Sequence, residues 1–125
     1  MIDLDLESAR AAQDIVKNCA AKDVLENVAT NTLGVLQENG VFAAILYTLT
    51  RSGDHDKAAA EIRRGLLGMA PRVDIRACNE RTAAGILDYL TTYVCNDLDR
   101  MLLVKQVWEQ TLIYTRFSAK AGKAS

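Results

Sequence analysis

The sequence predicts an all-α fold, a single compact bundle of about six helices that spans residues 1–125 and ends in a long helix. The chain contains one proline and is rich in alanine, and these residues are the weakest and the strongest helix formers. Half of its residues are hydrophobic, which is enough to build one core at this length. Apolar residues also recur at helical spacing between short turn signals.

A first helix is predicted over residues 4–20. Asp3 and Asp5 stand where first-turn acids favour the helix dipole. The helix is predicted from apolar residues near helical spacing, namely Leu6, Ala9, Val16 and Ala20.

A second helix is predicted to run to about Glu38. Asp23 and Glu26 have the spacing of a capping box at its start. Its inward face is predicted to carry Leu25, Val28, Ala29, Thr32 and Leu36. The Asn39-Gly40 pair then predicts a helix end or kink. A short apolar helix follows, with Phe42, Ile45, Leu46 and Leu49.

The sequence Ser52-Gly53-Asp54 predicts a stop and a new N-cap. The fourth helix should turn inward Ala59, Ile62, Leu66 and Met69, and Pro71 should mark its end. Residues 72–79 remain open between loop and helix. Asn79 is the predicted N-cap of a fifth helix with Ala83, Ile86, Leu87 and Leu90. Asn96-Asp97 should cap the last helix, from Leu98 to about Ala121.

Charge and cysteine content exclude several classes of protein. Fifteen basic residues against 16 acidic ones give a net charge of −1, which argues against a binder of bulk nucleic acid. Three cysteines with no close pair disfavour a disulfide framework and favour a reducing cytoplasm. The acidic N-terminus lacks the pattern of a signal peptide, and the longest apolar run, Val41 to Tyr47, is too short to span a membrane.

Catalytic and metal-binding patterns are weak. His55 is the only histidine, so the Asp54-His55-Asp56 sequence lacks the further ligands of a metal phosphohydrolase, and structural zinc is equally disfavoured. No phosphate-binding loop or nucleophile elbow is present. We therefore expect no enzymatic activity and no cofactor.

Basic residues form two candidate surfaces. On an ideal helix, Lys105, Arg116, Lys120 and Lys123 fall within about 60° of one another, as a ridge on the last helix that Glu109 and Leu112 interrupt. A second group is rich in arginine, which suits contacts to phosphate: Arg63, Arg64, Arg72, Arg76 and Arg81. Either group could equally be a solvated helix surface. The aromatic residues are expected to pack in the core or against a partner: Tyr89, Tyr93, Trp108, Tyr114 and Phe117.

Several short segments resemble one family. Leu36-Gln37-Glu38-Asn39-Gly40-Val41, followed by Ala43-Ala44-Ile45-Leu46, is similar to the "I-Q-x-N-G-L-x-x-A-L-A-F" core of a small all-helical subunit of the type III-B CRISPR effector, the Cmr complex. The opening stretch from Leu6 to Ala12, the break from Arg51 to Asp54 and the closing helix from Tyr114 to Ala121 are also similar to that family.

The resemblance implies a non-catalytic subunit that forms part of the inner filament of an RNA-guided effector. Its partners would be the backbone and large subunits, the guide RNA and the target RNA, with self-association along the filament. The candidate RNA contacts are Arg63, Arg64, Arg76, Arg81, Lys105, Arg116 and Lys120.

Two other functions remain open on the sequence. One is a helical protein–protein adaptor with no nucleic-acid role, in which exposed apolar residues matter and charge reversals have no effect. The other is a helix-turn-helix DNA reader built on the arginine-rich segment, but the fifth helix offers few polar residues that could read bases.

Overall fold

The computed structural model describes residues 3–124, and the predicted all-α fold is confirmed there. The described range contains no strand. Six α-helices and one 3₁₀ turn follow one another: α1 (Leu4–Lys17), α2 (Lys22–Asn39), α3 (Val41–Leu49), α4 (His55–Leu67), η1 (Ala70–Val73), α5 (Ala83–Tyr93) and α6 (Leu98–Ala124). The long C-terminal helix is α6, as predicted.

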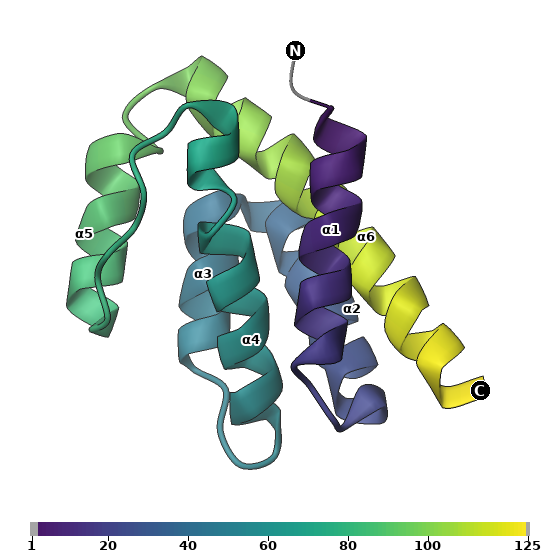
Figure 1. Cartoon of the computed structure of the whole chain (residues 1–125). Coiled ribbons are helices and arrows are strands. Elements are labelled where there is room, and N and C mark those ends of the chain that lie inside the picture. The colour runs from purple at the N-terminus through teal and green to yellow at the C-terminus, as the bar shows by residue number, and fades with distance from the viewer. Residues whose placement is uncertain (1–2, 125) are drawn as a thin grey trace.

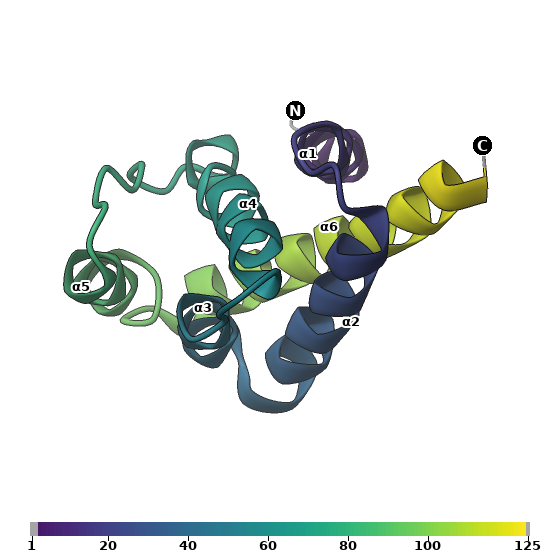
Figure 2. The same cartoon turned by 90° about the horizontal axis from the view of Figure 1, so that it is seen from below.

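Helix α6 organises the molecule. It packs most extensively against α2 and α1 (Figure 1). Helices α3 and α4 pack against α2, and α5 packs against α3. Seen from below, α1 and α2 lie along the C-terminal half of α6, whereas α3, α4 and α5 gather toward its N-terminal end (Figure 2). The two ends of α6 therefore have different neighbours.

The buried side chains form one cluster that draws on every α-helix. The predicted inward faces of the second and fourth helices are confirmed, because each of their named residues is buried. Helix α6 contributes Val104, Val107, Trp108, Leu112 and Ala119. The indole Nε1 of Trp108 donates a hydrogen bond of 2.9 Å to the Leu66 carbonyl, which joins α6 to the end of α4.

The first helix is present but ends earlier than predicted, and Val16 packs against the core. Leu6 is 44% exposed and Ala20 lies beyond the helix, which ends at Lys17. The buried residues of α1 are Ser8, Ala12 and Ile15. Ser8 and Ala12 are small, and the Ser8 hydroxyl lies 3.5 Å from the Val107 carbonyl of α6. Short side chains let the two helices approach closely, so this face is less hydrophobic than the pattern suggested.

The start of the second helix also differs from the prediction. Helix α2 begins at Lys22, so Asp23 lies in its first turn and does not form a capping box with Glu26. Both acids instead form ion pairs with Lys123 of α6. Lys22 has a different role, since its ammonium group donates to the carbonyls of Val16 and Cys19, close to the end of α1.

Gly40 confirms the predicted break. Its φ of 94° lies in the left-handed region, which only glycine adopts at little cost, and it is the single residue between α2 and α3. The chain thus changes helix without a loop at the Asn39-Gly40 pair. The predicted short apolar helix is α3; the side chain of Phe42 is half-buried in it and that of Leu46 is exposed.

Residues 72–79, left open by the sequence, form the end of η1 and an irregular segment. Pro71 lies inside η1, just after α4. From Asp74 the chain runs to α5 without regular structure. The predicted N-cap Asn79 is wrong, because the hydroxyl of Thr82 accepts the hydrogen bond from the Gly85 N–H. The predicted cap at the start of α6 is confirmed, since Asp97 Oδ1 accepts from the Arg100 N–H.

Candidate nucleic-acid interface

The Asp54-His55-Asp56 sequence lies at the start of α4. His55 opens α4, and its Nε2 lies 3.8 Å from a carboxylate oxygen of the exposed Asp54. Cys19, Cys78 and Cys95 are free thiols, and burial raises the pKa of Cys95. Among the described residues, no three His, Cys, Asp or Glu side chains gather as metal ligands would.

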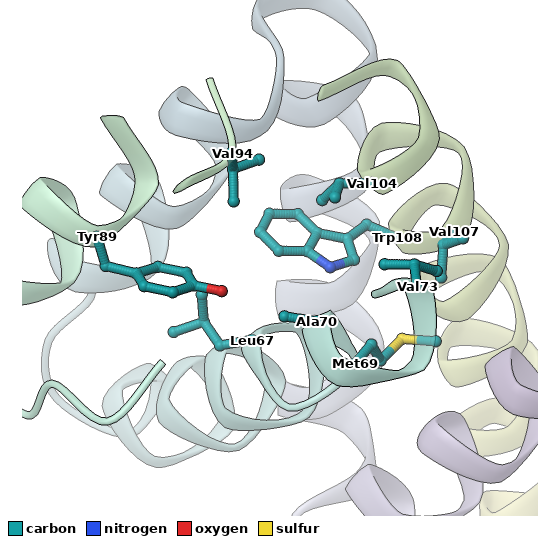
Figure 3. A pocket seen from close by; sticks show the side chains of 9 residues that line it. All are labelled: Leu67, Met69, Ala70, Val73, Tyr89, Val94, Val104, Val107 and Trp108. Carbon is teal, nitrogen blue, oxygen red and sulfur yellow. The ribbon is translucent and has the colours of Figure 1, made fainter. Parts of the chain in front are cut away.

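One apolar pocket lies inside the bundle, between the ends of α4, α5 and α6 (Figure 3). Its cavity volume of about 10 Å³ is close to the minimum for one water molecule. Trp108, Val94 and Val104 border it, and Tyr89 supplies the one hydroxyl among the labelled side chains. That hydroxyl donates to the Arg76 carbonyl. The pocket is a packing defect beside the indole ring and offers no room for a substrate.

Arg63 is half-buried between α3 and α4. Its guanidinium donates to the Thr48 carbonyl at 3.1 Å, and burial lowers its pKa. It therefore ties α4 to the end of α3. The Arg63 guanidinium, which was predicted to bind phosphate, is thus bound to a backbone carbonyl of the same protein.

Arg64 is paired with acids. Its Nη2 lies 2.7 Å from Glu61 and 2.9 Å from Asp14 of α1, and these hydrogen bonds raise its pKa. The pairing belongs to a groove between α1 and α4 that also holds Arg10 and Arg72, both bound to Glu7. Each of the three arginines of this groove therefore forms an ion pair with at least one carboxylate.

Arg76 and Arg81 lie on the irregular segment before α5, and both are exposed. The Arg76 guanidinium stacks 5.2 Å from the centre of the Tyr93 ring. Arg81 lines a shallow groove together with Arg63 and Arg64, so the structure brings three of the predicted residues together there. Neither Arg76 nor Arg81 forms an ion pair within the described residues.

The predicted ridge on the last helix is present in part. Lys105 and Arg116 are partly exposed and Lys120 is exposed, and none of the three forms an ion pair with any described carboxylate. The Arg116 guanidinium lies 4.9 Å from the ring centre of the exposed Phe117. Two members of the pattern behave otherwise, because Leu112 is fully buried and Lys123 is held by Asp23 and Glu26.

These basic residues fall on two separate surfaces. We call the first the α6 ridge (Lys105, Arg116 and Lys120) and the second the α5 surface (Arg76 and Arg81). In both views α5 lies at the opposite side of the molecule from the C-terminal end of α6 (Figures 1 and 2).

Sequence reasoning missed the arginine–carboxylate groove. Arg64 and Asp14 are fifty positions apart, so no local spacing connects them. The signal in the sequence was Gly65, a glycine inside a predicted helix. In the structure a Cβ at this position would lie 2.6 Å from the Ile15 side chain, so α1 and α4 approach closely here. The expected packing role of aromatic residues is confirmed for Tyr89 and Trp108, whereas Phe117 is 56% exposed.

The fold and these surfaces define an all-α protein with an arginine–carboxylate groove and two basic surfaces that form no ion pair with any residue in the range 3–124. No helix in residues 3–124 has both the length and the apolar character needed to cross a lipid bilayer. The chain matches no known protein-family model, and no curated protein or solved structure is significantly similar to it.

Proposed function

We propose that this protein is a non-catalytic, RNA-binding subunit of an RNA-guided effector of the type III-B CRISPR class. The α6 ridge is the observation that supports the proposal best. It presents three basic side chains along one helix, and none of them forms an ion pair with a described carboxylate. The Leu36–Leu46 segment and the closing helix resemble the small Cmr subunits, and this resemblance is the reason for proposing that particular assembly.

The mode of contact follows from the chemistry of these side chains. Lysine and arginine on a helix surface bind phosphate oxygens, which carry no sequence information. The α6 ridge is about 22 Å long from Lys105 to Lys120, at about 1.5 Å of rise per residue. With a net charge of −1, the isolated chain would bind RNA weakly, and the effector backbone and large subunits would supply most of the affinity.

The first experiment is a pull-down of the tagged protein from its native host, with and without RNase, read by mass spectrometry and RNA sequencing. We expect CRISPR backbone and large subunits together with guide-length RNA. Recovery of unrelated proteins without RNA would reject the assignment.

Charge reversal then tests the contact surface. The variant Lys105→Glu/Arg116→Glu/Lys120→Glu should release most of the RNA. Each phosphate that the variant no longer neutralises should lower the slope of log affinity against log salt by about 0.7–0.9. Arg76→Glu/Arg81→Glu tests the α5 surface in the same way. The matched control is Lys17→Glu/Lys57→Glu, since these exposed lysines lie outside both surfaces.

A protein–protein adaptor is the alternative, and exposed apolar residues on α6 favour it. Leu98, Leu102 and Phe117 are each more than half exposed. An adaptor would keep its partners when both basic surfaces are reversed, and it would lose them when these apolar side chains are replaced. The charge-reversal variants, compared with replacements of Leu98, Leu102 and Phe117, therefore separate the two functions.

A further inference from the structure

The outward face of α6 carries a stripe of exposed and partly exposed residues. Three of the five exposed large hydrophobic residues lie on this helix, namely Leu98 at 65%, Leu102 at 51% and Phe117 at 56% exposure. Residues spaced alternately by three and four positions lie along this face, and Leu102 and Ile113 are its apolar members, with Phe117 beside them. The stripe comprises Asp99, Leu102, Gln106, Glu109, Ile113, Arg116 and Lys120.

We propose that this stripe is the contact of a two-fold homodimer in which α6 packs antiparallel against α6 of a second copy. A two-fold axis between Glu109 and Gln110 brings Asp99 opposite Lys120 of the second copy. The same axis places Leu102 opposite Phe117. Each of these contacts occurs twice, because a two-fold interface uses one patch on both copies.

Charge complementarity identifies the occupant as a second copy. The stripe is acidic near the start of α6, at Asp99, and basic near its end, at Arg116 and Lys120. An antiparallel partner reverses this order, so that acid meets base at both ends. The antiparallel arrangement also places the opposite ends of the two helix dipoles together. A parallel arrangement would set like charges against each other.

The residues at the centre of the stripe limit the strength of the dimer. Two Glu109 carboxylates approach the axis from the two copies, and Gln106 pairs with the partly buried Ile113. The contact runs about 32 Å from Asp99 to Lys120, at about 1.5 Å per residue, along a single helix from each copy. Such a contact is at the small end of specific interfaces, so the dimer should dissociate on dilution. It is a closed pair, distinct from the open stacking of filament subunits.

Arg116 and Lys120 also belong to the α6 ridge, so this dimer and RNA would compete for the same face of α6. Sedimentation equilibrium of the full chain in RNA-free buffer tests the dimer whether or not the proposed function holds. We expect a reversible monomer–dimer equilibrium. Leu102→Glu and Phe117→Glu should each raise the dissociation constant at least tenfold, whereas Leu46→Glu, at an exposed apolar residue of α3, should leave it unchanged. Circular dichroism checks that each variant remains helical.

Charge exchange separates this specific pairing from nonspecific adhesion. Asp99→Lys and Lys120→Asp should each weaken the dimer, and the double variant should restore it because both pairs are reversed together. Glu109→Gln should tighten it by removing the like charges at the axis. A strictly monomeric chain at high concentration would overturn the proposal. So would single charge variants that the double variant does not rescue, or equal weakening by Leu46→Glu.

Discussion

At the scale of single residues, close packing and buried polar contacts determine which side chains can change. Gly65 lies where α4 comes closest to α1, and Tyr89 joins α5 to the irregular segment before it. Lys22 closes the end of α1 with two carbonyl contacts. None of these roles can be recognised from residue type alone, because each depends on a neighbour from another element or turn.

Gly65→Ala should destabilise the protein. A Cβ there would lie 2.6 Å from the fully buried Ile15 side chain, and the strain of overpacking costs about 1–3 kcal/mol. The gain in helix propensity returns about 1 kcal/mol, so the free energy of unfolding should fall by about 1 kcal/mol.

Gly34→Ala is the matched control. It lies within α2 with no atom within 4 Å of the added methyl, so it should raise the free energy of unfolding by up to about 1 kcal/mol. Urea denaturation of both variants measures the difference. Equal effects of the two substitutions would contradict the close approach of α1 and α4.

Tyr89→Phe should change the alkaline stability. Burial raises the pKa of Tyr89 to about 12 from its ordinary value of 10.0, so the folded state favours the protonated phenol. As the pH rises from about 10 to about 12, the unfolded chain releases this proton first and stability falls. Phenylalanine removes this fall, although the absence of the hydrogen bond to Arg76 costs about 1 kcal/mol at neutral pH. Thermal unfolding at pH 8 and at pH 11 measures both effects; the same alkaline decline in both proteins would contradict the assignment.

At the scale of helices, the sequence was sufficient where hydrophobicity alone defines the buried face. Helices α2 and α4 present continuous apolar stripes, and these faces were predicted correctly. Helix α1 instead buries the small residues Ser8 and Ala12, and its more hydrophobic Leu6 is exposed. Apolar periodicity identifies only the most hydrophobic face of a helix. It cannot identify a face whose small side chains allow a neighbouring helix to approach closely. The start of α5 was predicted wrongly because Asn79 and Thr82 are both suitable caps, and the helix begins after Thr82.

The capping residue of α6 offers a direct test at this scale. Asp97→Ala should lower the free energy of unfolding by about 1 kcal/mol, because it removes the Oδ1 acceptor of the Arg100 N–H. Asp54→Ala should have a smaller effect, since Asp54 precedes α4 without any side-chain cap hydrogen bond. Urea titrations of the two variants provide the comparison, and a larger destabilisation at Asp54 would refute it.

At the scale of the whole molecule, the candidate site was harder to predict than the fold. Seven basic residues were candidates for RNA contact, and their local sequence does not distinguish them. The structure shows that Arg64 is neutralised by Asp14 and Glu61, and that Arg63 braces Thr48. The α6 ridge lacks such partners in the described residues. This difference between the basic residues arises because helices from distant parts of the sequence pack together. The spacing of residues along the chain does not predict such contacts.

Unfolding should be cooperative, because one buried cluster includes residues of all six helices. Trp108 is the only tryptophan, and it is 3% exposed beside α4. Its fluorescence should shift to longer wavelength on unfolding, with the same urea midpoint as the loss of helical circular dichroism. Two distinct midpoints would show that α6 and the remaining helices unfold separately.

The central position of α6 also has a consequence for synthesis on the ribosome. Helices α1 and α2 bury their apolar faces mainly against α6, yet α6 is translated after all the others. While residues 98–124 are still inside the ribosomal tunnel, the nascent chain must expose Ile15, Leu25 and Leu36 to solvent or to a chaperone. A ribosome stalled before Leu98 should therefore present a chain that is readily cleaved by protease, and protection should appear only when α6 has emerged.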